Sequence, residues 1–305
     1  MIALLIFHWH VRFNYLGVVM RIFQEKPLFM VPFGKPVADA EEIVLTTPDG
    51  QTLNACYLHT KAPRKGVIVF GLEFGSTKWS CGPYTEFLLD AGYDIFTFEP
   101  RGQGSSVAKD GYQPLQWVTE FEISDYKTAL AYLKTRPDKD PRGVGLFGLS
   151  KGGSAGLIVA AGDEFIRCSV VDGVFAVNTT VVPYMYQFVM IYTKIPFAIR
   201  YLPIWYLRHV LWIAIRRVER ERQCRYVNLE PFMPKLSPRP LLMIHGGGDN
   251  YIKPDMAKKL FELAKEPKEF WLVEKAKHNQ AFHLAADEYK RRVLEFFEKN
   301  LASIG

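Results

Sequence analysis

The sequence lacks the cysteine pattern of a disulfide-bonded or zinc-binding domain. Its 305 residues include four cysteines, which lie far apart, form no Cys-x-x-Cys pair and stand in or beside apolar runs. This placement is typical of buried, reduced thiols and argues against a disulfide framework and a zinc site. We therefore expect no bound metal. The four residues are Cys56, Cys81, Cys168 and Cys224.

The chain also has no internal repeat, no low-complexity tract and no apolar run long enough to cross a bilayer. Hydrophobic residues make up 49% of it and charged residues 23%, which excludes a disordered or fibrous protein. Residues 1–23 are mostly apolar, but Arg12 and Arg21 interrupt the roughly 18–20 apolar residues that a spanning helix needs. No basic residue precedes the Ile2–Phe7 run and no small-x-small cleavage site follows it, so we expect no signal peptide.

Residues 1–40 form a distinct N-terminal segment, and the first 23 of them have helical periodicity. Their large apolar residues recur at helical spacing, with polar residues on the other side. Two interpretations remain open: an amphipathic helix in the plane of a membrane interface, or a helix packed on the surface of its own domain. The recurring apolar residues are Leu5, Trp9, Phe13, Leu16, Met20 and Phe23.

The net charge of +6 is concentrated in one stretch. Residues 200–225 contain seven arginines and two glutamates, which gives 7 − 2 = +5. The interspersed glutamates, the many aliphatic residues and the lack of a recognisable nucleic-acid module argue against binding to nucleic acid. We expect this stretch and residues 1–23 to contact an anionic membrane surface together. The protein would then be cytoplasmic, or peripherally bound at the cytoplasmic face of a membrane.

Short apolar runs alternate with longer helical stretches from about residue 41. Glu42–Thr47 and Leu53–Leu58 flank a Pro-Asp-Gly turn and predict a β-hairpin. The later runs are almost continuously apolar, as strands buried on both faces are, so we expect a mostly parallel sheet with helices on both faces. The predicted strands are Val67–Leu72, Tyr93–Phe98, Val144–Phe147, Ile166–Asp172, Leu241–His245 and Phe270–Val273. The predicted helices are Pro83–Ala91, Val118–Thr135, Gly152–Ala161, Pro254–Ala264 and Asp287–Asn300.

The alternation of strands and helices stops between residues 174 and 234. This stretch is rich in tyrosine, tryptophan, isoleucine and arginine, and it lies between two predicted strands. We interpret it as a largely helical cap inserted into one α/β domain that consists of residues 41–173 and 235–305.

The pentapeptide Gly148-Leu149-Ser150-Lys151-Gly152 follows one predicted strand directly and opens a predicted helix. Glycines two residues before and two residues after Ser150 let the backbone turn sharply, so the Ser150 hydroxyl projects above the sheet at a helix N-terminus. In this context the pattern predicts a nucleophile.

Two later loops carry an acid and a base. Asp249 follows three glycines after a late strand, and His278 lies between the last strand and the terminal helix. With Ser150 they occur in the order nucleophile, acid, base, each just past the carboxyl end of a strand. His283 is a rival base, but it falls within or at the start of the last helix. We expect His245, at the end of its strand, to be structural.

On these residues the chain resembles the α/β-hydrolases, near the branch of monoacylglycerol lipases and serine aminopeptidases, over about residues 40–300. The resemblance implies that Ser150 attacks an acyl carbonyl, that His278 takes and returns the proton, and that Asp249 holds the imidazole tautomer, without metal or organic cofactor. The matching motifs are Gly148-x-Ser150-x-Gly152, Asp249-x-x-Ile252, His278-x-x-x-Phe282, and Phe98–Ser106, which corresponds to the family's Asp-x-Arg-Gly-x-Gly-x-Ser turn.

One motif of the family is missing. The family usually has His-Gly after its third strand, where it supplies an oxyanion donor, and this chain has Leu72-Glu73-Phe74-Gly75. Aligning the two segments places one donor at the Phe74 N–H, with the Lys151 N–H as the other.

Glu73 is an alternative donor at this position. A carboxylate aimed at a developing oxyanion would oppose catalysis, so its side chain should turn away or pair with a cation such as Lys78 or Arg101. Loss of one donor raises the activation free energy by about 3–4 kcal/mol, so this departure from the family pattern affects the rate of the reaction more than its class.

The resemblance implies a serine hydrolase that acts on a carboxylic ester, a small molecule or a lipid, with an apolar acyl part. The apolar stretches Val174–Met190 and Ile195–Ile215 either line a tunnel for that acyl chain or only pack the cap on the domain. A serine peptidase, thioesterase or acyltransferase remains possible with the same three residues. A non-catalytic module that binds a membrane or a partner is a further alternative.

Overall fold

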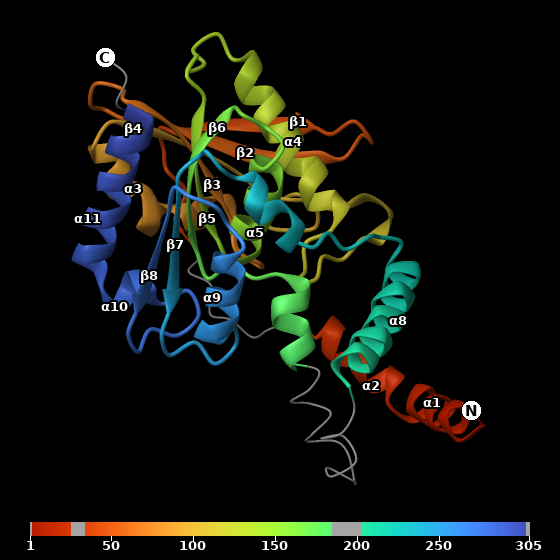
Figure 1. Ribbon diagram of the computed structural model, residues 1–305. Coiled ribbons are helices and arrows are strands. Elements are labelled where there is room, and N and C mark those ends of the chain that lie inside the picture. The colour runs from red at the N-terminus through yellow and green to blue at the C-terminus, as the bar shows by residue number, and fades with distance from the viewer. Residues whose placement is uncertain (1, 26–33, 185–202, 303–305) are drawn as a thin grey trace.

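An eight-stranded sheet forms the centre of the computed structural model, which describes residues 2–25, 34–184 and 203–302 (Figure 1). The strand order is β1-β2-β4-β3-β5-β6-β7-β8. The pairs β1–β2 and β2–β4 are antiparallel and the others are parallel, which confirms the mostly parallel sheet. The strands are β1 Glu41–Thr46, β2 Thr52–Leu58, β3 Gly66–Gly71, β4 Tyr93–Phe98, β5 Val144–Leu149, β6 Ile166–Asp172, β7 Leu241–Gly246 and β8 Lys268–Val273.

The strands differ from their predicted bounds mainly at two places. The predicted strand Val144–Phe147 continues to Leu149, because the backbone stays extended up to the turn at Ser150. At the sheet edge, β8 begins at Lys268 and not at Phe270. Its first residues alternate between partly buried and exposed, so an apolar run does not mark where this edge strand starts.

Helices cover both faces of the sheet, as predicted. Successive residues of a strand point to opposite faces, so Val67 and Val69 of β3 pack with α4, α5 and α9, while Ile68 and Phe70 pack with α3, α10 and α11. The α5 helix is buried along its whole length. The helices are α3 Gly82–Asp90, α4 Glu120–Thr135, α5 Ser150–Ala160, α9 Pro254–Glu262, α10 Ala281–Leu284 and α11 Ala286–Phe297.

The α4 helix begins two residues later than its apolar pattern predicts, because Thr119 caps it. The Thr119 side chain accepts a hydrogen bond from the Phe121 N–H, and the Glu122 carboxylate accepts one from the Thr119 N–H at 2.7 Å. This capping box satisfies backbone donors that the first turn leaves unpaired.

The inserted stretch between β6 and β7 is helical where the structure describes it. It contains the π-helical turn η3 (Val177–Val181), the long helix α8 (Ile204–Arg222) and the 3-10 turns η4 (Glu230–Lys235). The predicted apolar stretches Val174–Met190 and Ile195–Ile215 fall partly within residues 185–202, which lie outside the described residues.

The N-terminal segment forms two helices, α1 (Ile2–Asn14) and α2 (Leu16–Gln24), that lie with α8 at the lower right of Figure 1. Leu16, Val19 and Phe23 of α2 are buried in one apolar cluster with residues of α8. The Phe23 ring also stacks on the Trp117 ring at 5.2 Å, and the Trp117 indole N–H donates to the Phe23 carbonyl.

By contrast, α1 extends away from the sheet. Across residues 2–25, 34–184 and 203–302, no helix has both the length and the apolar content that crossing a bilayer requires.

Candidate active site

Ser150 occupies the turn between β5 and α5 with a φ of +47°, in the left-handed region that non-glycine residues rarely adopt. The glycines on either side permit this turn because no side chain fits there. A Cβ at Gly152 would lie 2.6 Å from the Leu72 N and closer still to the Leu72 carbonyl oxygen. A Cβ at Gly148 would lie 2.9 Å from the Gly153 N. The pentapeptide is therefore fixed by backbone packing between β3, β5 and α5.

The structure brings Ser150, His278 and Asp249 together. Ser150 Oγ lies 3.1 Å from His278 Nε2, and His278 Nδ1 lies 2.7 Å from Asp249 Oδ2. All three side chains are shielded from solvent, with 5% of the His278 side chain exposed. These three residues form the hydrogen-bonded chain that their order in the sequence predicts.

Backbone groups hold the Asp249 carboxylate in place. Its Oδ1 accepts hydrogen bonds from the Tyr251 and Ile252 N–H groups, both at 2.8 Å, so Oδ2 is left to face His278. Ile252 is itself fully buried, and the Tyr251 ring lies edge-on to the His278 ring at 5.5 Å. The spacing Asp249-x-x-Ile252 therefore orients the acid through a local turn.

The other two histidines near these loops have different surroundings. His283 lies on α10, is exposed, and contacts the rings of Tyr84 and Phe282. His245 is fully buried and its Nε2 lies 2.7 Å from the Ile252 carbonyl. Burial lowers the pKa of His245, so its neutral ring donates Nε2–H to that carbonyl and supports the loop that carries Asp249.

The proposed oxyanion donors are the N–H groups of Phe74 and Lys151. In the described part of the chain, neither of these N–H groups donates to a protein acceptor. The loop that carries Phe74 is tied down by the turn Phe98–Ser106: Gln103 Nε2 donates to the Glu73 carbonyl at 2.8 Å, and Glu99 accepts from the Lys78 N–H at 2.9 Å. The sequence does not indicate that Gln103 holds the Phe74 loop, although Gln103 lies in the motif Phe98–Ser106.

Glu73 does not pair with either cation that the sequence suggested. Its buried carboxyl turns toward the His278 loop and accepts a hydrogen bond from Asn279 Nδ2 at 2.5 Å. Lys78 instead pairs with Glu42 at 3.0 Å. Burial raises the pKa of Glu73, which favours its uncharged form next to Phe74 in the loop after β3.

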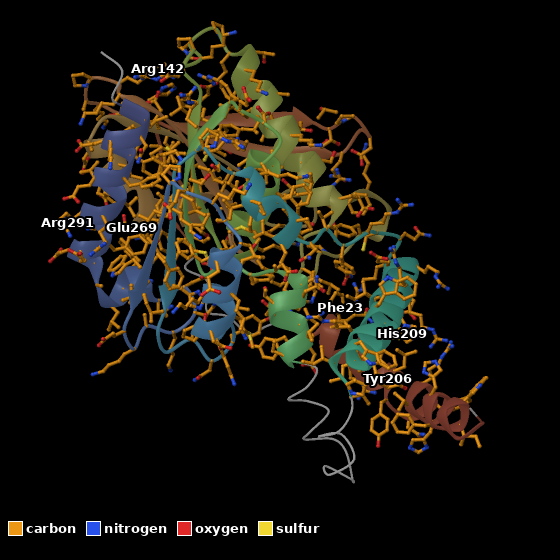
Figure 2. All side chains as sticks on the ribbon, viewed as in Figure 1. Phe23, Arg142, Tyr206, His209, Glu269 and Arg291 are labelled. Atoms are coloured by element: carbon orange, nitrogen blue, oxygen red, sulfur yellow. The ribbon has the colours of Figure 1, made fainter. Side chains whose placement is uncertain are left out.

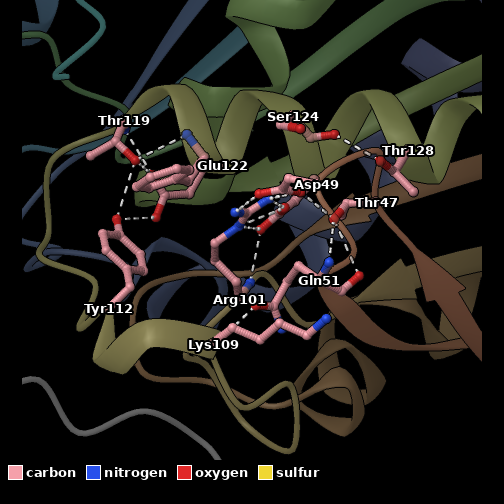
Figure 3. Close-up of polar contacts among 12 residues, drawn as sticks. Thr47, Asp49, Gln51, Arg101, Lys109, Tyr112, Thr119, Glu122, Ser124 and Thr128 are labelled. Carbon is pink, nitrogen blue, oxygen red and sulfur yellow. Dashed lines mark hydrogen bonds and ion pairs between the residues drawn. The ribbon is translucent and has the colours of Figure 1, made fainter. Parts of the chain in front are cut away.

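Arg101, the other suggested partner, is held by two aspartates, and Figure 3 labels one of them, Asp49. It lies 2.6 Å from Asp49 and 2.6 Å from Asp125. The hydrogen bond from Arg101 holds the pKa of Asp49 at about 2, whereas burial raises that of Asp125 to about 6 despite the same partner. The Asp-x-Arg-like turn therefore has a structural role here.

Arg101 also lines a cavity of about 480 Å³ between the sheet, α2 and the end of α8. Gln24, Tyr112 and Arg222 are among its other lining residues. Ser150, Asp249 and His278 are not, so this cavity is separate from the candidate active site.

The Lys151 side chain has a role that the sequence did not reveal. Its ammonium donates to the Leu115 carbonyl at 2.6 Å and to Glu122 Oε1 at 2.7 Å, and it lies 5.6 Å from the Phe74 ring. Figure 3 shows Glu122 beside Thr119 and Tyr112 at the start of α4. The Thr-x-x-Glu pattern reveals Glu122 as a helix cap, but nothing in the sequence links it to Lys151.

Asp172 is a further carboxyl that the sequence analysis did not single out, because it is the last residue of an apolar run. It is fully buried at the carboxyl end of β6, and its Oδ2 accepts a hydrogen bond from the Tyr289 hydroxyl at 3.1 Å. Burial raises the pKa of Asp172 to about 7, although the hydrogen bond from Tyr289 acts in the opposite direction.

Comparison with known sequences gives distant relatives over most of the chain. No family model matches the sequence. The protein YfhR of Escherichia coli K12 is 26% identical over 274 residues, which cover 87% of this chain and 82% of YfhR. The polyketide transferase ATR5 of Stachybotrys chlorohalonatus is 25% identical over 309 residues, 87% of this chain and 99% of ATR5. The thiohydrolase aneE of Aspergillus aculeatus is 26% identical over 140 residues, 44% of this chain and 43% of aneE.

Solved structures match the architecture more completely. The α/β hydrolase GrgF from Penicillium sp. sh18 has a TM-score of 0.67 at 20% identity, over 86% of this chain and 99% of GrgF. The Pyrococcus furiosus esterase Pf2001 has a TM-score of 0.66 at 20% identity, over 91% of this chain and 100% of the esterase. These likenesses show that the chain has the α/β-hydrolase fold, as its motifs predicted.

Proposed function

We propose that this protein is a serine hydrolase that cleaves a carboxylic ester with an apolar acyl chain through an acyl-serine intermediate. The observation that carries the proposal is the chain Ser150–His278–Asp249, with distances of 3.1 and 2.7 Å, built on a serine with a φ of +47°. A strained turn that buries a serine against a histidine costs stability, and its use as a nucleophile accounts for that cost.

In the proposed reaction, His278 is neutral and its Nδ1–H donates to Asp249. As Ser150 Oγ attacks the acyl carbon, His278 Nε2 takes the hydroxyl proton and a tetrahedral oxyanion forms. The carbon–oxygen bond to the alcohol then breaks, and His278 returns the proton to that oxygen. Water repeats the sequence on the acyl-serine, which releases the free acid and restores Ser150.

The oxyanion would be stabilised by the N–H groups of Phe74 and Lys151. Lys151 belongs to the first turn of α5, whose unpaired N–H groups favour negative charge. The raised pKa of Glu73 supports this assignment, because an uncharged carboxyl beside the hole opposes the oxyanion less than a carboxylate does.

An aromatic side chain near the reacting atoms supports an apolar acyl part, because the Tyr251 ring lies edge-on to the His278 ring at 5.5 Å. With this ring and the four motifs of the sequence, we further propose that the protein acts like the monoacylglycerol lipase branch of the fold.

The first test is hydrolysis of p-nitrophenyl esters from acetate to palmitate by the protein and by Ser150→Ala. We expect a rate that depends on Ser150 and is highest for a medium or long chain. A fluorophosphonate probe should label the protein and not Ser150→Ala, whereas labelling of both would exclude Ser150 as the nucleophile. A maximum at acetate would support a serine hydrolase but contradict a binding site for an apolar acyl chain.

A second candidate, acyl transfer or hydrolysis of a thioester, is favoured by two of the relatives. One is named a polyketide transferase and the other a thiohydrolase. An ester and a thioester with the same acyl chain distinguish the candidates, each assayed with and without a small alcohol as acceptor. A Ser150-dependent preference for the thioester, or transfer to the alcohol in place of hydrolysis, would favour the second candidate.

The same assays also test two functions that the sequence left open, a peptidase and a binding module without catalysis. Cleavage of amides but not esters, with Ser150 labelled, would indicate a peptidase. No Ser150-dependent rate and no labelling would leave a binding module without catalysis.

A further inference from the structure

The exposed phenylalanines and tryptophans of the described chain gather on two helices. They are Phe7, Trp9 and Phe13 on α1, and Trp205 and Trp212 on α8. Phe13 is 81% exposed and Trp205 67%, which is unusual for side chains of this size. We call these five residues the aromatic surface.

The two helices that carry the aromatic surface, α1 and α8, contact each other. His8 Nδ1 lies 3.2 Å from the Tyr206 hydroxyl, the Phe7 ring lies 5.8 Å from the Tyr206 ring, and the His8 ring lies 5.7 Å from the His209 ring. Figure 2 labels Tyr206 and His209 where α8 approaches α1, at the opposite end of the molecule from Arg142. Trp9 and Phe13 stack on each other and remain exposed.

The charges around the aromatic surface are mostly positive, and Glu219, which follows these residues on α8, pairs with Arg216 at 3.0 Å. Residues 2–24 and 203–218 contain no aspartate or glutamate. They contain five arginines, all of them exposed: Arg12, Arg21, Arg208, Arg216 and Arg217. Arg216 lies over the Trp212 ring at 5.6 Å. Exposed tryptophans with several arginines and few acids are typical of a helix that lies in the interface of an anionic bilayer.

The neighbouring helix α2 fixes the aromatic surface to the domain. Its buried residues Leu16, Val19 and Phe23 share an apolar cluster with Val210 and Leu211 of α8. The surface is therefore presented by a folded support and does not depend on folding at the membrane.

We infer that α1 and the exposed side of α8 form a docking surface for an anionic lipid bilayer, with the aromatic side chains at the level of the lipid headgroups. Charge complementarity selects this occupant, because five exposed arginines, with one described carboxylate (Glu219, on Arg216) paired to them, favour the anionic cytoplasmic leaflet over a neutral surface. The same apolar cluster includes Ile252 and Phe175 beside the candidate active site, so α2 and α8 connect the aromatic surface to that part of the domain.

Sedimentation of the full chain with vesicles tests this inference. The vesicles are phosphatidylcholine alone, and phosphatidylcholine with phosphatidylserine at roughly 2:1. We expect binding to the anionic vesicles and little to the neutral ones, and weaker binding as salt shortens the Debye length from about 10 Å at 0.1 M to about 3 Å at 1 M. Equal binding to both vesicles, or none to either, would overturn the inference.

Two double variants separate the aromatic and the charged contributions. Trp9→Ser with Phe13→Ser should weaken binding about tenfold or more, because the apolar side chains no longer enter the interface. Arg208→Gln with Arg217→Gln should weaken it about 25-fold, at about fivefold for each arginine near an anionic surface.

Matched controls remove similar side chains elsewhere. Val107→Ser with Leu284→Ser removes two exposed apolar side chains, and Lys127→Gln with Lys139→Gln removes two exposed cations on and beside α4. Both controls should bind the anionic vesicles as the unaltered protein does. Equal losses in controls and variants would show that the aromatic surface has no special role.

Two further readouts complete the test. Soluble ester hydrolysis should be unchanged in all four variants, so a failure of the membrane inference can be told apart from a failure of the proposed function. Light scattering reports whether the unaltered protein is a dimer that Trp9→Ser with Phe13→Ser dissociates. That result would assign the aromatic surface to a second copy of the chain and overturn the inference.

Discussion

The ammonium of Lys151 lies 2.7 Å from the carboxylate of Glu122, and both side chains are almost completely buried. Lys151 follows Ser150 in the chain, whereas Glu122 caps α4 through the Thr119 N–H. One ion pair therefore joins the turn that carries Ser150 to the start of a helix on the face of the sheet.

Removing one partner of this pair should destabilise the protein strongly. Glu122→Gln and Lys151→Met each leave a buried charge without its partner, so each should lower the free energy of unfolding by about 3–5 kcal/mol. The double variant should cost less than the sum of the two, as measured by urea unfolding. Lys259→Met, in an exposed pair with Asp255, should cost less than about 1 kcal/mol. Additive losses would mean that the two residues act independently.

Gly152→Ala should destabilise the turn at Ser150 and reduce catalysis. The added Cβ would lie 2.6 Å from the Leu72 N, and overpacking of this kind costs about 1–3 kcal/mol. Gly82→Ala is the control, since its Cβ meets nothing within 4 Å in a helical backbone, and it should be neutral or slightly stabilising. Thermal unfolding and ester hydrolysis report the two effects, and equal melting temperatures for both variants would contradict the close approach.

Asp172 should make the protein less stable as the pH rises. Its pKa is about 7 in the folded protein and about 3.9 in an unfolded chain, so between these values the unfolded state releases a proton that the folded state still holds. The loss is complete above about pH 7 and amounts to at most about 4 kcal/mol. Asp172→Asn keeps an acceptor for Tyr289 and removes the penalty.

Urea unfolding at several pH values measures this difference. The advantage of Asp172→Asn should be small near pH 4 and grow to its full size near pH 8. Asp255→Asn, at an exposed position, should show no such growth. A constant difference between Asp172→Asn and the unaltered protein would mean that Asp172 is ionised in both states.

Truncation of Phe23 should destabilise the protein much more than truncation of Phe13. Phe23→Ala removes a buried ring that stacks on Trp117 and should cost about 3–5 kcal/mol. Phe13→Ala removes an exposed ring and should change the free energy of unfolding by less than about 0.5 kcal/mol. Similar costs for both would mean that α1 and α2 pack alike on the domain.

The ratio of the kcat of Glu73→Gln to that of the unaltered protein should increase as the pH rises. The raised pKa keeps Glu73 uncharged up to a higher pH than usual, and above that pH its carboxylate opposes the proposed oxyanion. Glutamine still accepts the hydrogen bond from Asn279 and stays neutral, so the kcat ratio should increase by about tenfold, or ~1.4 kcal/mol. The exposed Glu86→Gln should leave the pH profile unchanged, and a flat ratio for Glu73→Gln would place its charge away from the oxyanion.

The sequence predicts most of the sheet because strands buried on both faces are continuous apolar runs. It places the start of the edge strand β8 two residues too late, because that strand begins with the polar residues Lys268 and Glu269. It locates Ser150, Asp249 and His278 because each follows a strand in a recognisable local pattern. It does not predict the partner of Glu73, because that partner, Asn279, lies 206 positions along the chain.

The N-terminal segment shows a different limit of prediction. One helical period runs through residues 5–23, but the structure divides it at Tyr15 into two helices with different surroundings. Periodicity indicates that a face is apolar. Which part of that face is buried depends on α8, which the pattern of residues 5–23 does not contain.

The packing of α2 on α8 also sets an order of events during synthesis. Val19 and Val210 share one apolar cluster, and 210 − 19 = 191 positions separate them. At roughly 5–20 residues per second, a ribosome needs about 10 to 40 s to cover that distance. The apolar face of α2 has to remain without its partner for this time, available to chaperones or to a nearby bilayer. The helix that packs on α8 in the finished protein is therefore synthesised long before its partner.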